Sequence, residues 1–291
     1  RQSEVQTGGN CVVTGLGLVG QLTVQLLNAS GIRTIGIDLD ESRVKLAIES
    51  GAVYAWKRDQ EGLEELVKEA TGGYGTDAVI ITAASSSNDP VELAGSLCRH
   101  RGKVVIVGAV PTGFSRTNYY KKELDLRMSC SYGPGRYDPV YEEKGIDYPA
   151  GLVRWTENRN MQAFVDLLTS GKLNIDKLIS HIFPLEKVPE AYDMILLKNQ
   201  TFSGILIEYK YNNDLTDTVQ INNIKVTKGL PVAGLIGAGN FAQNILLPRL
   251  KGLVNFKGLC TAEGSGSLYA GKKYGFGYCT TDYRKILEDD S

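Results

Sequence analysis

The chain has only two histidines and five cysteines among its 291 residues, and no two cysteines form a C-x-x-C pair. A zinc site needs three or four convergent Cys, His or carboxylate ligands, and these residues are too dispersed to form one. An odd number of scattered cysteines also argues against a disulfide framework. We therefore expect reduced thiols in a cytoplasmic protein, structural or solvated roles for His100 and His181, and no metal bound by this chain.

Neither sign of charge dominates, and no long apolar run is present. Lys and Arg total 32 and Asp and Glu total 33, so the formal net charge is −1. A near-neutral chain has no strong field to hold nucleic acid or an anionic membrane, and no run of about 18 apolar residues could cross a bilayer. The first ten residues are polar, unlike a secretory signal. We expect a small-molecule substrate rather than nucleic acid or a membrane as the main partner.

Glycine, by contrast, is abundant, with 33 residues, many of which stand where an apolar run ends. This punctuation is typical of an α/β chain with tight strand-to-helix turns. Over the first 130 residues, short apolar runs alternate with helical patterns, which predicts a parallel sheet covered on both faces, a doubly wound Rossmann sheet. The expected strands are 11–14, 34–38, 53–55, 78–81, 103–107 and 126–131, and the expected helices are 18–29, 41–50, 62–71 and 91–99.

Changes of pattern divide the chain into four segments. Residues 8–157 form the expected Rossmann domain and end in a long irregular stretch rich in Tyr, Gly and Pro. Residues 158–209 follow, with expected helices at 158–170 and 189–197 and strands at 182–184 and 204–209. Residues 210–229 are the expected linker, within which 218–226 could form a short strand. Residues 230–291 restart the alternation as a second, incomplete Rossmann unit, with strands 232–236 and 256–261 and helices 240–250 and 267–274.

A glycine-rich turn lies between the first expected strand and the first expected helix. Gly15-Leu16-Gly17-Leu18-Val19-Gly20 matches the pattern G-x-G-x-x-G. Gly15 permits the tight turn, Gly17 lets a diphosphate approach the backbone, and Gly20 lets the helix pack close to the strand. Free N–H groups at the helix N-terminus favour the same anion. The turn therefore predicts a dinucleotide-binding site.

Asp38 ends the second expected strand, 18 residues after Gly20. That spacing is close to the one expected for a carboxylate that binds the ribose hydroxyls of NAD. A 2′-phosphate would meet a like charge there, at a cost on the order of 4 kcal/mol per unit charge at 4 Å and an effective dielectric of 20, which Arg43 could partly offset. We predict NAD rather than NADP. Asp38 could instead cap the next helix, but Asp40 is better placed to do so.

A second turn, Gly237-Ala238-Gly239-Asn240-Phe241-Ala242, repeats the pattern later in the chain. Alanine replaces the third glycine, which the fingerprint tolerates. The partner acid is less clear, because only Glu263 follows the next expected strand. A bound cofactor and a purely structural sheet edge both remain open for this turn.

Residues 8–209 resemble the nucleotide-binding half of the medium-chain, zinc-dependent alcohol and polyol dehydrogenases. The likeness lies in Val12 to Gly20, Asp38 with Arg43, Ala47 to Ala52, Val105 to Gly108, and Ser180 to Leu185 leading to Ala191-Tyr192. It implies that Gly15 to Gly20, including Leu18 and Val19, cover the diphosphate and that Asp38, Leu39 and Arg43 bind the adenosine ribose. It further implies that Ala83, Gly108, Ala109 and Val110 line the nicotinamide. Zinc would come only from that family's N-terminal domain, which this chain does not include.

Residues 230–291 resemble the start of the glucose–fructose oxidoreductase and inositol dehydrogenase (Gfo/Idh/MocA) family. The likeness lies in Gly237 to Phe241, Tyr274-Gly275-Phe276 and Thr281-Asp282-Tyr283, and it implies cofactor contacts by Gly237, Gly239, Asn240 and Phe241. The two modules in tandem resemble bacterial two-module oxidoreductases of cell-surface polysaccharide synthesis. The run from Tyr132 to Asp138, continued at Asp147-Tyr148-Pro149, is the most specific sign of that group. The resemblance implies that this chain is an internal piece of a longer protein.

Arg136, Tyr137 and Trp155 follow the last expected strand, at the edge where doubly wound sheets bind ligands. They suit a sugar or nucleotide sugar through stacking and bidentate hydrogen bonds, or they pack the loop or a subunit contact. We expect an NAD-dependent oxidoreductase acting on a sugar or polyol, with catalytic residues that the sequence does not identify. A non-catalytic NAD sensor or scaffold is the alternative. Apolar strands in 173–209 would also favour a homo-oligomer.

Overall fold

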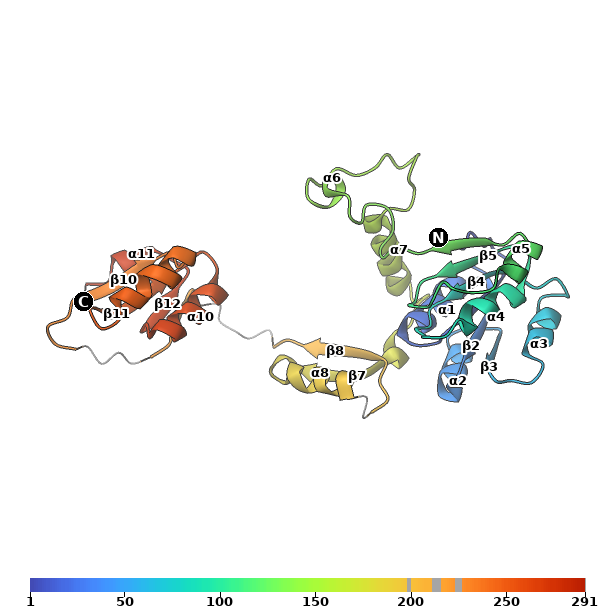
Figure 1. Cartoon of the computed structure of the whole chain (residues 1–291), viewed down its shortest axis with the longest axis horizontal. Helices are drawn as coiled ribbons and strands as arrows, with labels where there is room; N and C mark the ends of the chain where they lie inside the picture. Colours follow the sequence, from blue (N-terminus) through green and yellow to red (C-terminus); the bar gives the residue numbers. More distant parts are fainter. Residues whose placement is uncertain (198–199, 211–215, 223–226, 291) are drawn as a thin grey trace. The chain divides into compact units, whose positions relative to one another are not determined.

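The computed structural model describes residues 1–291 except 198–199, 211–215, 223–226 and 291. The chain divides into two compact units, Arg1–Tyr209 and Lys210–Ser291 (Figure 1). The first unit contains a six-stranded and a two-stranded sheet and the second a four-stranded sheet, and we describe each unit by itself.

The first unit contains a six-stranded sheet in which every pair of neighbours is parallel, in the order β3-β2-β1-β4-β5-β6. Its strands are β1 Asn10–Thr14, β2 Arg33–Asp38, β3 Tyr54–Lys57, β4 Thr76–Ile81, β5 Cys98–Ile106 and β6 Asp125–Met128. The strand order changes direction between the neighbours β1 and β4, because β2 and β3 are added on one side of β1 and β4 to β6 on the other. Since β1 leads into the glycine turn, the turn lies at the switch point where such sheets bind ligands. The predicted doubly wound α/β fold is confirmed.

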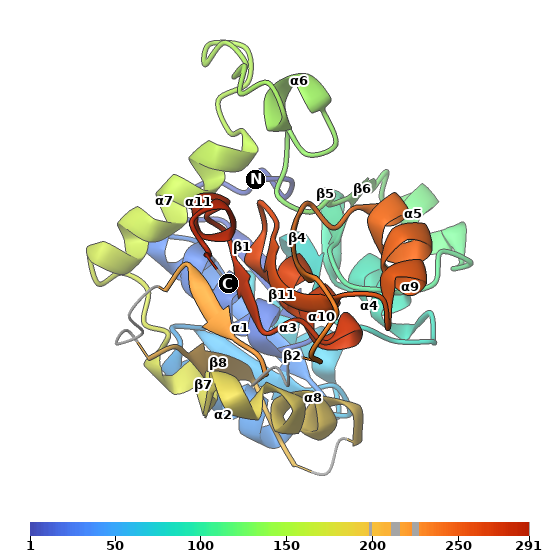
Figure 2. The same ribbon diagram turned by 90° about the vertical axis from the view of Figure 1, so that its left-hand side faces the viewer.

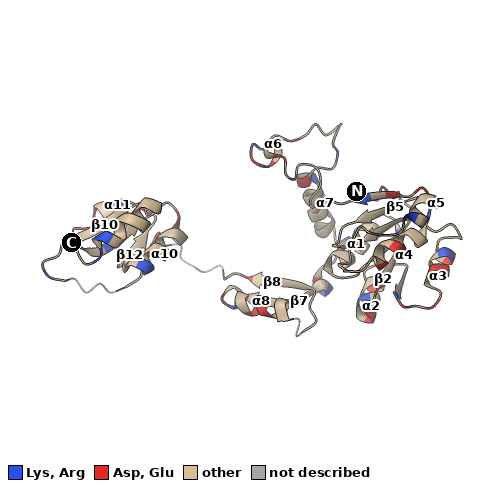
Figure 3. Cartoon of the chain, viewed as in Figure 1, with Lys and Arg blue, Asp and Glu red and all other residues tan. Residues whose placement is uncertain are grey.

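Side chains alternate along β1 and pack against helices on opposite faces of the sheet. Cys11 and Val13 join a buried cluster with Val24 and Val44, from helices α1 Leu18–Ala29 and α2 Glu41–Glu49. Val12 joins a second cluster, with residues of α3 Leu63–Ala70 and α4 Asp89–Leu97. The two-residue period of a strand thus places helices on both faces. Figure 3 shows charged residues of both signs on α2 and α3, whereas α1 carries none and the charged residues of α4 are acidic.

The end of α4 differs from the prediction. The helix stops at Leu97 and β5 begins at Cys98, so Arg99 and His100 lie in a strand. Lys122 explains the early end, because its Nζ donates hydrogen bonds to the carbonyls of Gly95, Ser96 and Cys98 at 3.0, 2.6 and 2.8 Å. A cation on the last carbonyls of a helix satisfies acceptors that have no partner within the helix.

The remainder of the first unit begins with helix α5 Arg116–Lys121, the short helix α6 Pro139–Glu142 and helix α7 Glu157–Thr169 (Figure 2). Strands β7 Ile179–Pro184 and β8 Gly204–Glu208 form a parallel pair, and α8 Val188–Leu197 lies between them in sequence. Gln25 of α1 attaches this segment to the sheet domain, since its amide exchanges two 2.8 Å hydrogen bonds with the Asn174 backbone.

The second unit contains a four-stranded sheet in the order β10-β11-β12-β9. The strands β10 Val232–Ile236, β11 Asn255–Cys260 and β12 Tyr278–Thr280 are parallel, and β9 Thr218–Gln220 is antiparallel to β12. Part of the expected linker is thus a strand of this unit, while 211–215 and 223–226 lie outside the described residues. Helix α10 Gly264–Tyr274 packs on the sheet, and α11 Arg284–Leu287 follows β12.

The expected helix 240–250 contains a π-helical turn, Ala242–Leu246, before α9 Leu247–Leu250. Pro248 gives the reason, because a proline has no N–H to complete the regular i to i−4 ladder.

All five cysteines are free, and four of them are buried while Cys130 is exposed. Among the described residues, no group of three or more His, Cys, Asp or Glu side chains could hold a metal ion. No helix in the described part of the chain is both long and apolar enough to cross a membrane.

Asp77 makes the stability of the first unit sensitive to acid. Its carboxylate accepts hydrogen bonds from the Asn10 N–H at 2.8 Å and from Arg99 Nε at 2.7 Å. Burial opposes the charged form, but the hydrogen bonds from Asn10 and Arg99 outweigh it and hold the pKa of Asp77 below its ordinary 3.8. Because the folded pKa is lower than the unfolded one, this stabilisation is present above about pH 4 and is lost as the pH falls.

We therefore expect Asp77→Asn to lower the free energy of unfolding by about 1.5–3 kcal/mol at pH 7 and to flatten its fall towards pH 3. Urea titrations at pH 7, 4 and 3 would measure this through Trp56 and Trp155, since both tryptophans lie in the first unit. Asp166→Asn serves as the control, because the Asp166 side chain is exposed. Identical pH profiles for Asp77→Asn and the wild type would contradict the assignment.

Candidate nucleotide-binding site

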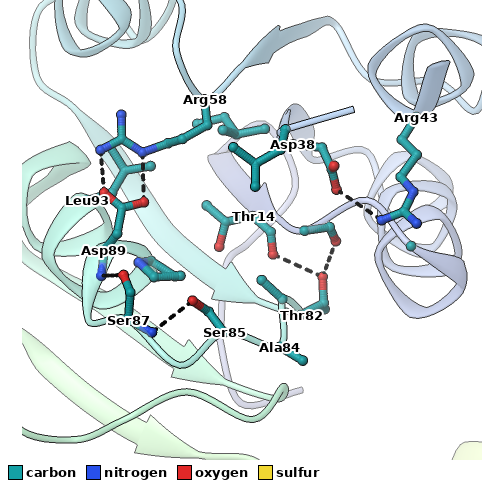
Figure 4. Close-up of a pocket in the computed structure, with 16 residues that line it drawn as sticks. Thr14, Asp38, Arg43, Arg58, Thr82, Ala84, Ser85, Ser87, Asp89 and Leu93 are labelled. Carbon is teal, nitrogen blue, oxygen red and sulfur yellow. Dashed lines mark hydrogen bonds and ion pairs between the residues drawn. The ribbon is translucent and has the colours of Figure 1, made fainter. Parts of the chain in front are cut away.

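A pocket of about 470 Å³ opens at the carboxyl ends of β1, β2 and β4 (Figure 4). It is lined by the glycine turn, by the residues that follow the neighbouring strands, and by the start of α4. The lining residues are Thr14, Gly15, Gly17, Ile37, Asp38, Leu39, Arg43, Arg58, Thr82, Ala83, Ala84, Ser85, Ser87, Asp89, Pro90 and Leu93. The sequence-predicted Gly15, Gly17, Asp38, Leu39, Arg43 and Ala83 are therefore brought together.

The three glycines of the turn have different physical roles. Gly15 has φ +88°, and a Cβ there would lie 2.5 Å from the backbone nitrogen of Ala83. A Cβ on Gly20 would lie 2.0 Å from the Gly15 carbonyl oxygen. At Gly17, by contrast, a Cβ would meet nothing within 4 Å. Gly15 and Gly20 are thus required by the fold, while Gly17 leaves open space beside the backbone.

The start of α1 presents hydrogen-bond donors next to that space. Gly17 is the N-cap, with no side-chain cap and no acidic residue in the first turn. The first intrahelical bond runs from the Gln21 N–H to the Gly17 carbonyl at 2.9 Å, so the earlier N–H groups, including those of Leu18 and Val19, have no acceptor within the helix. Such a terminus binds anions.

Asp38 is only 8% exposed, yet it keeps capacity to bind a ligand. One carboxylate oxygen accepts from the Leu16 N–H and the other from the Asp40 N–H at 2.9 Å. A carboxylate has about four acceptor positions, so hydroxyl groups in the pocket can still bind. Arg43 Nη1 lies 3.9 Å from Asp38 Oδ2. As predicted, Asp40 rather than Asp38 caps the next helix, accepting from the Ser42 N–H at 2.8 Å.

Arg58 and Asp89 form a wall of the pocket that no sequence motif predicts. Arg58 follows β3, and Asp89 is the first residue of α4. The guanidinium binds the carboxylate bidentately, Nε to Oδ2 at 2.9 Å and Nη2 to Oδ1 at 2.6 Å (Figure 4). The two residues are 31 positions apart, so only the tertiary fold reveals the pair.

Gly108, Ala109 and Val110, which the sequence predicts beside the nicotinamide, support the lining and do not form it. A Cβ on Gly108 would lie 2.1 Å from the Ala83 carbonyl oxygen, and the Ala109 carbonyl accepts from the Ser85 N–H at 2.9 Å. Val110 packs against the core. Their contact with a nicotinamide stays a prediction.

The loop residues Arg136, Tyr137 and Trp155 do not line the pocket. Arg136 forms an ion pair with Glu142, and its guanidinium carbon lies 4.4 Å from the centre of the Tyr137 ring. The guanidinium carbon of Arg154 lies 4.1 Å from the centre of the Trp155 ring. These contacts support packing within the loop, and a role in substrate binding stays a prediction.

The turn of the second unit repeats the geometry of the first, without the acid. The Gly237 N–H donates to the backbone carbonyl of Cys260 at 2.7 Å, as the Gly15 N–H donates to the backbone carbonyl of Ile37 at 2.8 Å. Since Ile236 pairs with Cys260 and Thr14 with Ile37, the place of Asp38 is taken by Thr261. Glu263 is the N-cap of α10, as Asp40 is of α2. Gly239, Asn240 and Phe241, whose side chain is 67% exposed, belong to this turn, and cofactor contacts by them stay a prediction.

Comparison with known proteins points to dehydrogenases. Residues 19–144 match the family model described as zinc-binding dehydrogenase. Sorbitol dehydrogenase of Halalkalibacterium halodurans is 27% identical over 67% of this chain and 50% of the relative. D-Guloside 3-dehydrogenase of Escherichia coli is 27% identical over 66% of this chain and 52% of the relative. The chain thus spans about half the length of these curated relatives.

Solved structures show the same fold. Alcohol dehydrogenase TADH from Thermus sp. ATN1 has a TM-score of 0.54 and 23% identity, covering 72% of this chain and 53% of its own. An alcohol dehydrogenase (rspB) from E. coli CFT073, solved with NADH, has a TM-score of 0.54 and 22% identity, covering 70% and 53%. Over residues 19–144, the first unit is thus similar to the zinc-binding dehydrogenase family.

Proposed function

We propose that the first unit binds NAD and serves an oxidoreductase that transfers hydride between the nicotinamide and a sugar or polyol-type alcohol or carbonyl. The observation that carries this proposal is the open space at Gly17 next to the nearly buried carboxylate of Asp38. Together they offer donors for a diphosphate and acceptors for ribose hydroxyls at adjacent places in one pocket.

The residues present fit this cofactor, which when bound supplies the hydride acceptor. The N–H groups at the start of α1 would hold the diphosphate, and Asp38 with Arg43 would hold the adenosine ribose. The wall made by Arg58 and Asp89, with Leu93 in the same lining, would enclose the adenine end. The described residues offer no metal-binding group, so we derive no step through zinc.

The relatives support the substrate class of this proposal. Two of them are named sorbitol dehydrogenase and D-guloside 3-dehydrogenase, and a structural neighbour was solved with NADH. We further propose that the protein is a cytoplasmic homo-oligomer with a small-molecule substrate, which Arg136, Tyr137 and Trp155 would contact. The second unit would be a module of the Gfo/Idh/MocA type that acts in polysaccharide synthesis. The Gly237 turn supports that module, in which Thr261 would take the place that Asp38 has in the first unit.

A non-catalytic NAD sensor or scaffold is the alternative. Assays of the full-length protein with NAD⁺, zinc and a panel of polyols and nucleotide sugars separate the two functions. Turnover supports the oxidoreductase, while tight NAD⁺ binding without turnover of any member supports the sensor.

Replacing Asp38 tests the cofactor assignment. We expect the wild type to bind NAD⁺ more tightly than NADP⁺. Asp38→Ser should lower the ratio of NAD⁺ to NADP⁺ affinity at least roughly tenfold, because it removes charge-assisted bonds of about 1.5–3 kcal/mol and relieves repulsion of the 2′-phosphate. Isothermal titration calorimetry with both dinucleotides measures the ratio.

Asp40→Ser is the matched control, since it removes the same charge two residues away and leaves a good helix cap. It should leave the ratio unchanged. Equal ratios for the Asp38 and Asp40 variants would contradict the proposed ribose site.

A further inference from the structure

Gln21 is a buried amide beneath the glycine turn that the dinucleotide motif does not include. It lies in the first turn of α1 and is only 1% exposed. Its Nε2 donates to two backbone carbonyls, that of Leu16 at 3.1 Å and that of Arg43 at 2.9 Å. Since both hydrogens of the amide nitrogen are used on acceptors, the orientation of the amide is fixed.

These bonds close a ring of contacts around the proposed ribose site. The Leu16 N–H donates to the Asp38 carboxylate, and the Leu16 carbonyl accepts from Gln21. Gln21 also binds the Arg43 carbonyl, and the Arg43 guanidinium returns to Asp38 at 3.9 Å. Gln21 therefore bonds directly to the glycine turn and to the backbone of Arg43, and it is linked to Asp38 through Leu16.

Gln21 makes its side-chain contacts through its donor group and not through its acceptor. The Oε1 atom of Gln21 is buried and has no hydrogen-bond partner among the described residues. A buried acceptor without a partner costs free energy that an apolar side chain would avoid. The useful part of Gln21 is thus its donor group, which faces the turn and Arg43.

The second unit carries the same contact independently. Gln243 stands six residues after Gly237, as Gln21 stands six after Gly15. Its Nε2 donates to the Ala238 carbonyl at 2.7 Å, which corresponds to the bond from Gln21 to Leu16. In each of the two turns, a glutamine thus donates a hydrogen bond to the carbonyl of the residue after the first glycine. The additional bond to Arg43 is found in the first unit.

We propose that Gln21 is a positioning residue that sets the preference for NAD over NADP, by fixing Asp38 and Arg43 relative to the glycine turn. This inference rests on the proposed function. The group discriminated is the 2′-substituent of the adenosine ribose, which Gln21 itself does not touch.

The test compares Gln21→Met with Gln25→Met. Gln25 is a second buried amide on α1, 7% exposed, whose two hydrogen bonds go to Asn174 and not to the turn. Calorimetric titration of the whole chain with NAD⁺ and NADP⁺, beside thermal unfolding, gives affinity, selectivity and stability. We expect Gln21→Met to weaken NAD⁺ about tenfold and to lower the NAD⁺/NADP⁺ ratio severalfold. Gln25→Met should lower the melting temperature and keep both affinities within twofold of the wild type.

Gln21→Ser keeps the inference testable if Gln21→Met fails to fold, because its small side chain leaves room for water beside the two carbonyls. A reduced NAD⁺/NADP⁺ ratio in this folded variant supports the positioning role. Unchanged ratios in the folded Gln21 variants, with a wild type that prefers NAD⁺, overturn this inference and leave the proposed function standing. A wild type that binds neither dinucleotide overturns both.

Discussion

Gly17→Val is expected to lower NAD⁺ affinity at least roughly 100-fold, equivalent to about 2.7 kcal/mol, while the melting temperature falls only slightly, because valine is a poorer N-cap than glycine. A Cβ at Gly17 meets no atom of the protein within 4 Å, and its extended backbone, φ −68° and ψ −167°, suits a branched residue. The new side chain would therefore occupy only the space proposed for the diphosphate. Calorimetric titration and a thermal scan measure the two quantities.

The control for this variant is Gly151→Val, at another glycine with nothing within 4 Å and outside the pocket lining. It should change neither affinity nor stability. If Gly17→Val binds NAD⁺ like the wild type, the diphosphate does not lie against this turn.

Gly20→Ala, by contrast, is expected to act on stability, because it should destabilise the first unit by roughly 3 kcal/mol or more. On helix propensity alone, alanine would stabilise a helix by about 0.5–1 kcal/mol. At Gly20, however, the Cβ would lie 2.0 Å from the Gly15 carbonyl oxygen, so α1 must move away from β1. Scanning calorimetry measures the loss.

Gly266→Ala provides the matched comparison, because Gly266 lies within α10 and has nothing within 4 Å. It should be neutral or slightly stabilising. If Gly20→Ala were as stable as the wild type, the turn would have to be more open than the structure shows.

The core of the site could be predicted from the sequence because its signals are local. The glycines of the turn lie within six residues and Asp38 ends the next strand, so strand, turn and helix fix their relative places. Arg43 follows Asp38 by five residues, Leu39 and Ala83 are expected from the family resemblance, and the structure places all three in the same lining.

The rest depends on pairings between distant residues, for which a single sequence carries no signal. Arg58 and Asp89 meet only because β3 and α4 end near the same pocket. The bond from Gln21 to Arg43 requires α1 and α2 to pack side by side. Thr261 could be matched to Asp38 only once the strand register was known. Lys122 ends α4 from 24 or more residues away.

The measurement that tests the central claim most directly is a crystal structure of the chain with NADH. We predict the diphosphate against the N–H groups of Gly17 to Val19, with the adenosine ribose hydroxyls hydrogen-bonded to the Asp38 carboxylate. A dinucleotide bound elsewhere, or one whose ribose makes no contact with Asp38, would contradict the account.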